Sequence, residues 1–490
     1  MNMTVVAAPS RLLIGGEAHS PTAGTYPIVN PATEEVVAEA PVAGPGDVEA
    51  AIQAAKEAFP AWAQTSREER ARLLNRAADI VESRADELAA LIQAETGALM
   101  SVARWFQVPG TAGRLRRYAR GALEVRDVPL APHPVPSTVL GPGALAGAIA
   151  ARRPVGVVAC ITPYNWPMGS MAGKVGPALA TGNTVVVKPA PQDPLACLAL
   201  GEIMIEAGFP PGVINVLTAA GPEAGAALVD SPDVDMISFT GSTAVGTRIA
   251  ETGGRTLKRL FLELGGKGAA IVLPDADIAT AVTGIAATWT FQSGQGCILP
   301  TRALIHRSIY DEMVAALAAK AGSLKVGDPL ESDTVVGPVI SAAQRERIEA
   351  LTQSARDEGA RIAAGGVRPE HLARGFYAVP TLVSDADPAM TIAQNEVFGP
   401  VVTAIPYDTV DEAVEIANGT PYGLHNYVFS RDLTAAYDLA PRLRSGYVSL
   451  NNSLQHPEAP FGGFKRSGLG RDGGSFALDV YTELQSVVWT

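Results

Sequence analysis

Cysteine is scarce in this chain, which has three, Cys160, Cys197 and Cys297, among 490 residues. The number is odd and no pair has the spacing of a metal-binding motif, which argues against a disulfide framework and indicates a reducing compartment. The N-terminus lacks a basic segment followed by an apolar run, so no secretory signal is expected. We therefore predict a cytoplasmic protein.

Basic charge is also scarce, because 38 Lys and Arg stand against 50 Asp and Glu and give a net charge of −12. This balance argues against a nucleic-acid partner, which requires a basic surface. The six histidines are scattered without HxxxH or HxxE spacing. We expect neither a catalytic metal nor a Ser-His-Asp triad.

Continuous apolar runs of membrane length are absent as well. Two long uncharged stretches, 154–173 and 278–301, are interrupted, the first by prolines and the second by adjacent Gln, Ser and Gly residues. Neither can form an uninterrupted membrane-spanning helix, so no membrane partner is expected. Both stretches are better interpreted as buried interior near a site.

Apolar residues make up 47% of the chain, which is typical of a folded protein. Helical patterns occupy 47–61 and a segment that starts at Ser66, where Ser66 and Glu69 fit a capping box. Five prolines between 129 and 142 then predict an excursion from the main body, either a linker or a projecting hairpin.

From residue 155 onward, apolar runs alternate with helical patterns, which predicts an α/β fold with parallel strands covered on both faces. Strands of a first series are expected at 155–161, 184–187, 213–217 and 236–239. Strands of a second series are expected at 269–273, 302–306, 401–405 and 427–429, with a final strand at 481–489.

A candidate phosphate loop lies at 239–246, after a predicted strand and before a helical pattern. Gly241 and Gly246 have the spacing of a dinucleotide-binding turn, but Thr243 replaces the middle glycine. Backbone N–H groups and the Ser242 hydroxyl could hold a phosphate at the helix N-terminus. A plain β–α turn explains the segment equally well.

Three other residues stand in unusual local sequence. Cys297 follows two glycines and two amides, a composition that indicates a loop rather than core and a setting that can lower a thiol pKa and stabilise an oxyanion. Glu263 lies between two leucines before a Gly-Gly turn, where a raised pKa would suit a general base, or the residue could simply form a salt bridge. Asn165 ends an apolar strand and either donates to an oxyanion or stabilises a turn between prolines. Cys160 and Cys197 are expected to be inert core.

These motifs together resemble the aldehyde dehydrogenase superfamily over nearly the whole chain. The matching segments, in order, are 163–167, 182–189, 262–267, 291–297, 394–400 and 460–465. The spacing between Glu263 and Cys297 is also similar to that of the family.

The resemblance implies covalent catalysis at Cys297, whose thiolate would attack an aldehyde. Asn165 and the Cys297 backbone N–H would hold the oxyanion, and the hydride would pass to NAD or NADP. Glu263 would then activate the water that releases the carboxylic acid. Lys174 matches a lysine that is thought to pass protons between the catalytic Glu and solvent.

The resemblance also implies a dinucleotide site. Lys188 would bind the adenosine ribose, Ser242 the pyrophosphate and Glu396 the nicotinamide ribose, with Phe398 packed nearby. The further cofactor contacts are expected at Ile161, Thr162, Pro163, Gly241, Gly246 and Leu264. A Glu that favours NAD in many members is replaced by Pro191, so NADP is also allowed, with NAD slightly favoured.

The implied architecture has a Rossmann-like dinucleotide-binding domain over 1–128 and 148–258 and an α/β catalytic domain over 259–467. A small β oligomerisation element would consist of 129–147 and 468–490. Members of the family are dimers or tetramers, so a homodimer or homotetramer is expected.

The substrate channel is expected to be lined by Trp166, Gly173, Ile298, Gln455 and Phe461. Gly173 replaces a bulky aromatic residue of some relatives, which predicts a wide channel. None of these residues is Arg or Lys, so we predict an uncharged, apolar or aromatic aldehyde. Ser475 replaces a Glu that assists proton transfer in many members, which leaves the proton exit route open.

Three alternatives remain at this point. A CoA-acylating relative would pass the thioester to CoA, although such relatives typically lack the base at the position of Glu263. A protein on this scaffold could instead bind without catalysing, since a fold does not guarantee activity. A phosphorylating dehydrogenase would need a Cys–His pair, and the histidine nearest to Cys297 in sequence is His306.

Overall fold

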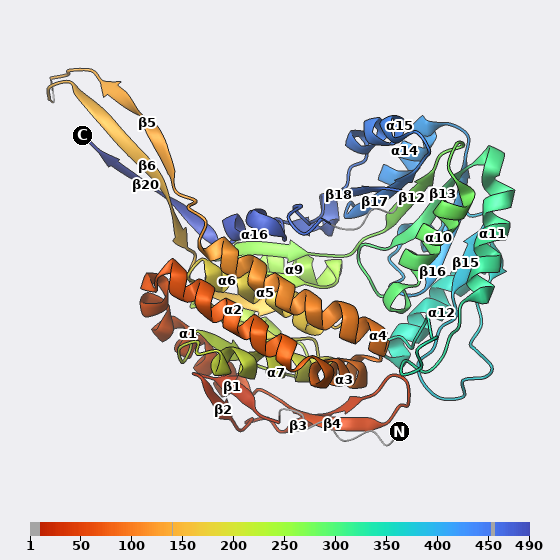
Figure 1. Cartoon of the computed structure of the whole chain (residues 1–490), viewed down its shortest axis with the longest axis horizontal. Helices are drawn as coiled ribbons and strands as arrows, with labels where there is room; N and C mark the ends of the chain where they lie inside the picture. Colours follow the sequence, from red (N-terminus) through yellow and green to blue (C-terminus); the bar gives the residue numbers. More distant parts are fainter. Residues whose placement is uncertain (1–9, 140, 452–455) are drawn as a thin grey trace.

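The structure, a computed structural model, describes residues 10–139, 141–451 and 456–490. Two lobes and an arm are visible in Figure 1: the lower lobe contains most of the N-terminal half, the right lobe most of the C-terminal half, and the arm projects at the upper left. The described strands form sheets of eight, seven, three and two strands. The two-stranded sheet pairs β3 (Thr25–Val29) with β4 (Val36–Pro41).

The eight-stranded sheet of the lower lobe has the order β19-β11-β10-β7-β8-β9-β1-β2. Its parallel centre consists of β11 (Arg259–Glu263), β10 (Met236–Thr240), β7 (Val157–Ile161), β8 (Thr184–Lys188) and β9 (Ile214–Val216). Antiparallel edges are added by β19 (Gly468–Leu469), β1 (Leu12–Ile14) and β2 (Glu17–His19). The first predicted strand series is therefore confirmed within two residues at each end, whereas β11 was not predicted.

Helices cover both faces of this sheet, because alternate residues of its parallel strands enter two different cores. Val158 and Cys160 of β7 pack into one core and Ala159 into the other. The first core is covered by α2 (Arg67–Ser83), α3 (Ala85–Thr96), α5 (Val108–Ala122), α6 (Pro167–Ala180) and α7 (Pro194–Glu206). The second is covered by α1 (Pro45–Gln64), α8 (Glu223–Asp230) and α9 (Thr243–Gly254).

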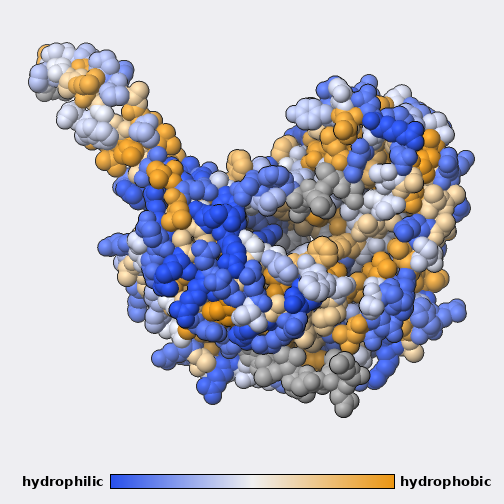
Figure 2. Space-filling model, in the orientation of Figure 1, coloured by the Kyte–Doolittle hydropathy of each residue, from blue (hydrophilic) through white to orange (hydrophobic). Residues whose placement is uncertain are grey.

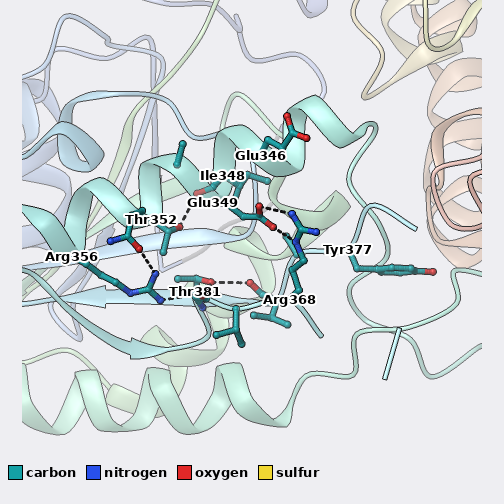
Figure 3. Close-up of a pocket in the computed structure, with 14 residues that line it drawn as sticks. Glu346, Ile348, Glu349, Thr352, Arg356, Arg368, Tyr377 and Thr381 are labelled. Carbon is teal, nitrogen blue, oxygen red and sulfur yellow. Dashed lines mark hydrogen bonds and ion pairs between the residues drawn. The ribbon is translucent and has the colours of Figure 1, made fainter. Parts of the chain in front are cut away.

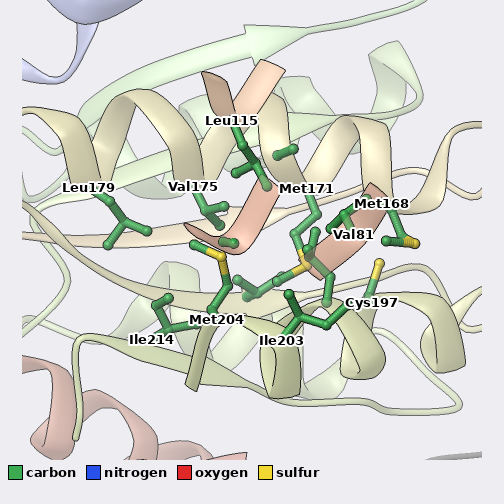
Figure 4. Close-up of a cluster of buried hydrophobic side chains, with 14 of the residues drawn as sticks. Val81, Leu115, Met168, Met171, Val175, Leu179, Cys197, Ile203, Met204 and Ile214 are labelled. Carbon is green, nitrogen blue, oxygen red and sulfur yellow. The ribbon is translucent and has the colours of Figure 1, made fainter. Parts of the chain in front are cut away.

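The first core brings methionine and branched side chains of α2, α5, α6 and α7 together (Figure 4). Cys197 lies among them and Cys160 is buried on β7, so both thiols are core residues, as expected. The predicted helix start at Ser66 is confirmed, since the Ser66 hydroxyl accepts from the Glu69 N–H at 3.2 Å. A short helix α4 (Met100–Val102) and a π-helical turn, η1 (Ala103–Gln107), precede α5.

The seven-stranded sheet of the right lobe has the order β14-β15-β16-β13-β12-β17-β18. Its strands are β14 (Arg361–Ala364), β15 (Thr381–Ser384), β16 (Val401–Tyr407), β13 (Pro300–His306), β12 (Gly268–Val272), β17 (His425–Phe429) and β18 (Tyr447–Leu450). Its helices are α10 (Ile278–Trp289), α11 (Tyr310–Ser323), α12 (Ala342–Asp357), α13 (Thr391–Gln394), α14 (Val410–Asn418) and α15 (Leu433–Leu439). The second predicted strand series is confirmed, while β14, β15 and β18 were not predicted.

The arm is a hairpin of β5 (Val128–Val135) and β6 (Ala144–Pro154), extended by β20 (Thr482–Trp489) along β6. The proline-rich excursion is therefore a projecting hairpin and not a linker (Figure 1). Apolar residues lie along the arm in Figure 2. Those that the structure leaves exposed are Val128, Leu130, Val135, Leu145, Leu484, Val487, Val488 and Trp489.

We propose the predicted division into domains with two adjustments from sheet membership. β19 pairs with β11, so 468–469 belong to the eight-stranded sheet and not to the small β element. β11 pairs with β10, and the chain enters the second sheet only at β12. The crossing between the lobes thus lies between Glu263 and Gly268, and Glu263 is the last residue of the first sheet. No helix in the described part of the chain is long and apolar enough to cross a bilayer.

Candidate active site

The loop that carries Cys297 is held in an unusual backbone conformation. It follows a 3-10 turn, η2 (Phe291–Gly294), in which Gln292 and Ser293 have φ angles of 52° and 56°. A side chain at Gly294 would overlap the backbone of Gly399, so this loop packs directly on the segment 399–400. Cys297 itself is half-buried.

Asn165 is joined to the cysteine loop by two hydrogen bonds. Its side-chain amide donates to the Gln295 carbonyl at 2.8 Å, and Gln292 Nε2 donates to the Asn165 carbonyl at 3.0 Å. The structure therefore brings together two residues that lie far apart in the sequence. One amide hydrogen of Asn165 is used by this contact, which leaves the second for a ligand.

Glu263 ends β11 as a buried carboxylate, and neither of its oxygens has a hydrogen-bond partner within the described residues. Burial raises its pKa well above the usual range, and the Asp472 carboxylate raises it further. Lys174, Arg471 and Arg114 act in the opposite direction. Glu263 is therefore a proton acceptor to which no described residue donates a hydrogen bond.

Burial also raises the pKa of the Cys297 thiol, and the Glu263 and Glu396 carboxylates add to the effect. The backbone N–H groups of Cys297 and Ile298 lower the pKa, as the loop composition predicts, but they are outweighed. The expectation of a lowered thiol pKa is therefore wrong for the ligand-free protein, because burial, with the charges of two carboxylates added, outweighs the backbone N–H groups.

Lys174 lies on α6 as a buried ammonium. Burial lowers its pKa to about 8, while Asp472, Cys160 and Glu263 raise it. Its Nζ donates to the Ser238 hydroxyl at 3.3 Å and stands 5.0 Å from the centre of the Phe261 ring. It is thus electrostatically coupled to Glu263 and can exchange a proton near neutral pH.

Sequence reasoning placed a lost proton-transfer group at Ser475, but Ser475 serves another purpose. Its hydroxyl accepts from Arg117 at 2.9 Å and donates to Glu124 at 3.2 Å. The carboxylate coupled to both Glu263 and Lys174 is instead Asp472, which accepts from the Tyr118 hydroxyl at 3.0 Å. Asp472 stands directly before Gly473 and Gly474, much as Glu263 stands one residue before a Gly-Gly pair. This similarity was the signal in the sequence that could have identified Asp472.

The predicted phosphate loop has the geometry of a helix N-terminus. Ser242 caps α9 and accepts from the Val245 N–H at 3.3 Å. A side chain at Gly246 would overlap Leu264, so the glycine permits α9 to pack closely on the strand that carries Glu263. The first turn of α9 thus presents free N–H groups beside the end of β10.

Lys188 and Ile161 are paired at the ends of β8 and β7, and the Thr162 N–H donates to the Lys188 carbonyl at 3.1 Å. Burial lowers the pKa of Lys188, whose side chain forms no hydrogen bond or ion pair within the described residues. The buried Thr162 hydroxyl also has no partner there. Pro163 follows, so four predicted cofactor residues lie at one sheet edge.

Glu396 and Phe398 lie on the other lobe and face the Gly265–Gly266 turn. The Gly266 N–H donates to Glu396 Oε1 at 2.8 Å, and burial raises the pKa of Glu396 to about 7. Phe398 has a φ of 57°, a strained value for an aromatic residue, and its ring meets Tyr164 edge-on at 5.9 Å. Contacts across the lobes therefore position both residues.

These features fit a nicotinamide dinucleotide. The unpartnered Lys188 ammonium and Thr162 hydroxyl are buried donors that a ribose could satisfy, and the N-terminus of α9 suits a pyrophosphate. Pro191 is half-buried nearby and places no carboxylate there. No group of three or more His, Cys, Asp or Glu residues in the described segments is arranged to hold a metal ion.

Aromatic side chains surround the approach to Asn165. Trp166 and Phe291 lie 6.1 Å apart, and Phe106 of η1 meets Phe291 edge-on at 6.1 Å. On the late loop Phe461 lies 6.5 Å from Tyr447. The Ile298 carbonyl accepts from the Tyr427 hydroxyl at 3.0 Å, while Gln455 lies outside the described residues.

The space that Gly173 leaves beside α6 is not empty. A side chain at Gly173 would overlap Nη1 of Arg114, so a guanidinium from α5 occupies the space that the glycine leaves. Sequence reasoning missed Arg114 because the contact joins two helices that are separate in the sequence.

A cavity of about 560 Å³ lies away from these residues, between α12 and the segments 366–368 and 377–381 (Figure 3). Glu349 and Arg368 point toward one another at its rim. It contains none of the predicted site residues, so it is a separate feature of the right lobe.

Comparison with known proteins decides the family. A model of the aldehyde dehydrogenase family matches residues 18–487. The chain belongs to the aldehyde dehydrogenase family. It is an NAD(P)-dependent oxidoreductase that oxidises aldehydes, and its fold of Rossmann-like and α/β catalytic lobes is that of its relatives.

Individual relatives are similar to this enzyme over almost its whole length. It is 39% identical to 3-succinoylsemialdehyde-pyridine dehydrogenase of Pseudomonas sp., with 94% of each chain covered. Aldehyde dehydrogenase C of Pseudomonas syringae, solved as a cysteine-to-alanine mutant with NAD+ and octanal, is 40% identical with a TM-score of 0.92, over 98% of this chain and 96% of that one. An aldehyde dehydrogenase of Bacillus cereus solved with NAD+ is 38% identical with a TM-score of 0.93, over 99% and 97%.

Proposed function

We propose that this enzyme converts an aldehyde to the free carboxylic acid through a thioester on Cys297, with Glu263 as the base for the hydrolytic water. One observation carries the proposal. The buried Glu263 carboxylate, which has no hydrogen-bond partner in the described residues, raises the pKa of the Cys297 thiol, and the Asn165 amide is hydrogen-bonded to the loop that carries this thiol.

The first stage is attack by sulfur on the carbonyl carbon. The thiol proton passes to solvent water as the C–S bond forms, because burial raises the thiol pKa and disfavours a free thiolate before the aldehyde arrives. The free amide hydrogen of Asn165 and the Cys297 N–H stabilise the oxyanion. NAD(P), when bound, accepts the hydride that the tetrahedral carbon releases.

The second stage is hydrolysis of the thioester. Glu263 takes a proton from water as the water attacks the acyl carbon, and its raised pKa makes it a stronger base than an exposed Glu. Lys174 and Asp472 then carry the proton outward, since both are coupled to Glu263 and Asp472 is partly exposed. Asp472 thus takes the place for which Ser475 was considered.

We assign the cofactor contacts as predicted from the sequence. Lys188 and Thr162 bind the adenosine ribose, and Ser242 with the first turn of α9 binds the pyrophosphate. Glu396 accepts from the nicotinamide ribose. Pro191 cannot repel a 2′-phosphate, so the site accepts NADP as well as NAD. The relatives solved with NAD+ support a slight preference for NAD.

The substrate has an apolar or aromatic body that enters between Trp166, Phe291 and Phe461. The aromatic spacing supports this assignment, and the octanal complex of the Pseudomonas syringae relative is consistent with it. The prediction that the substrate is uncharged rested on the lack of a cation among the expected channel residues. Arg114 lies beside Gly173, one of these residues, so that argument no longer supports an uncharged substrate. The enzyme acts as a homodimer or homotetramer in the cytoplasm, an assignment that rests on the family resemblance and the exposed apolar arm.

The test is reduction of the nicotinamide, followed by absorbance, with aliphatic and aromatic aldehydes and with NAD and NADP in the absence of CoA. Cys297→Ala should abolish turnover. Glu263→Gln should keep a first burst of reduced cofactor and slow the steady state, because acylation precedes the water step.

Loss of the burst in Glu263→Gln would assign thiol activation to Glu263 as well. Turnover that requires CoA and yields no free acid would replace hydrolysis by acyl transfer to CoA. If no pair of aldehyde and cofactor gave reduced nicotinamide, with or without CoA, the protein would be a binding protein with this fold.

A further inference from the structure

The space above Gly173 holds a guanidinium. Arg114 of α5 reaches over α6, where its Nη1 donates to the Gly169 carbonyl at 3.1 Å. Any side chain at position 173 would collide with Nη1. A glycine at this position is therefore what admits Arg114 to the face of α6 that holds Gly169 and Gly173, beside which the substrate channel is proposed.

Most of the hydrogen-bonding capacity of Arg114 is free. Its ion pair is with Asp472, at 3.5 Å from Nη1, and Asp472 also accepts from the Tyr118 hydroxyl and the Gly473 N–H. Within the described residues, Nε and Nη2 of Arg114 donate no hydrogen bond, and the side chain is 48% exposed. The planar fork of donors is thus available to an incoming molecule.

The surroundings favour an acceptor. Three cations, Lys174, Arg471 and Arg114, act on Glu263, while Asp472 is the carboxylate that opposes them. The neighbouring Arg117 is already paired with Glu458 and Glu124 and donates to Ser475, so it does not compete for the same molecule. A substrate oxygen near Arg114 would meet a positive field and unfilled donors.

We propose that Arg114 is a specificity-determining residue that selects aldehydes with a carboxylate or carbonyl oxygen on the body of the molecule, remote from the reacting carbon. This inference rests on the proposed aldehyde oxidation and names its substrate class. The aldehyde of such a substrate lies at Cys297, its apolar body passes the aromatic rings, and its acceptor oxygen meets the guanidinium.

The experiment compares kcat/KM for matched pairs of aldehydes. One series pairs ω-oxo acids of four to six carbons with n-alkanals of the same length, and another pairs 4-formylbenzoate with 4-isopropylbenzaldehyde. The ratio within each pair is measured for the wild type and for variants. Because each variant ratio is divided by the wild-type ratio, the intrinsic reactivity of the aldehydes cancels.

Arg114→Leu should lower kcat/KM about ten- to a hundredfold for the best acceptor-bearing aldehyde, mainly through KM, and less than about twofold for its alkyl partner. Arg114→Lys should recover part of the loss. Arg116→Leu is the matched control, since Arg116 lies on the same helix but pairs with Asp79 and Glu82 on the surface. It should leave both ratios unchanged.

A second variant reaches Arg114 without removing it. Gly173→Ala adds a methyl group where Nη1 lies and must displace the guanidinium, so it should reproduce the selectivity of Arg114→Leu. Equal losses for both members of each pair, or unchanged ratios in both variants, would overturn the inference. Absence of turnover with every aldehyde in the wild type would instead overturn the proposed oxidation, so the two failures are distinguishable.

Discussion

At the scale of single residues, burial sets the protonation of both groups on which the proposed chemistry depends. Burial raises the pKa of the Cys297 thiol and that of the Glu263 carboxyl, and the Glu263 carboxylate adds to the shift of the thiol. Burial disfavours the charged form of each group, so each gives up its proton at a higher pH than an exposed group of the same kind. Activity should therefore increase with pH until Glu263 ionises.

Asp472→Asn tests this electrostatic account. The Asp472 carboxylate raises the pKa of Glu263, so its removal should lower that pKa and move the rising limb of kcat against pH to lower pH. The measurement is a pH profile of steady-state turnover. Asp479→Asn, which alters a carboxylate paired with Arg126 and Arg152 instead, should leave the limb in place. An unmoved limb in Asp472→Asn would remove Asp472 from the proton route.

Asn165→Ala tests the oxyanion donor. Loss of one donor to a developing oxyanion should lower kcat about 10²–10³-fold. Gln292→Ala is the control, because it removes the hydrogen bond to the Asn165 carbonyl but leaves the Asn165 amide in place. Turnover and circular dichroism of both variants give the comparison. An unchanged kcat in Asn165→Ala would mean that this side chain only shapes the turn.

The sequence predicted the residues whose local surroundings are unusual and missed those defined by distant contacts. Cys297, Glu263 and Asn165 stand in glycine-rich or proline-flanked segments that are untypical of core or surface. Arg114 lies among several arginines on α5, and nothing in its local sequence marks it. Its place becomes visible only when α5 packs on α6 and Gly173 leaves space.

At the scale of elements, helix α12 positions the loop that carries Glu396 and Phe398. Gln344 Nε2 donates to the Val397 carbonyl at 3.0 Å and to the Phe398 carbonyl at 2.8 Å, and Arg347 donates to the Glu396 carbonyl at 2.8 Å. These bonds compensate the strained backbone of Phe398. The first turns of α12 therefore hold the proposed nicotinamide side of the cofactor site.

Gln344→Ala should weaken NAD binding about five- to tenfold, as expected for the loss of hydrogen bonds worth about 1 kcal/mol, with kcat little changed. Isothermal titration of the enzyme with NAD measures the effect. Gln353→Ala, on the same helix but bonded to Asp357 at the surface, should bind NAD normally. Equal affinity in wild type and Gln344→Ala would show that the loop keeps its conformation without α12.

Element prediction succeeded where burial leaves a clear pattern. The central parallel strands are buried on both faces and read as apolar runs. β11 begins with the exposed Arg259, and the edge strand β14 is exposed or half-buried along its length, so neither gives such a run. The proline-rich segment left linker and hairpin open, because its prolines hide the strand pattern of β5. Its conformation is set by pairing with β6, which β20 in turn extends.

At the scale of the whole molecule, the arm is too thin to bury its own apolar residues. β5 is exposed along its length, and β20 is exposed from its second residue to its last. Exposure of so much apolar surface to water is unfavourable for a three-stranded sheet without a core, and such surfaces typically mark an interaction site. A second copy of the chain that covers the arm would account for it, in agreement with the expected dimer or tetramer.

The double variant Leu484→Lys, Val488→Lys should therefore dissociate the assembly. Both side chains are exposed on β20, by 59% and 63%, and a buried, unpaired ammonium at an interface is strongly unfavourable. Light scattering after size exclusion should give a dimer or tetramer for the wild type and a monomer for the variant. Leu433→Lys, at a 60% exposed position on α15 away from the arm, should keep the wild-type mass. A monomeric wild type, or a variant that stays assembled, would show that the arm does not mediate oligomerisation.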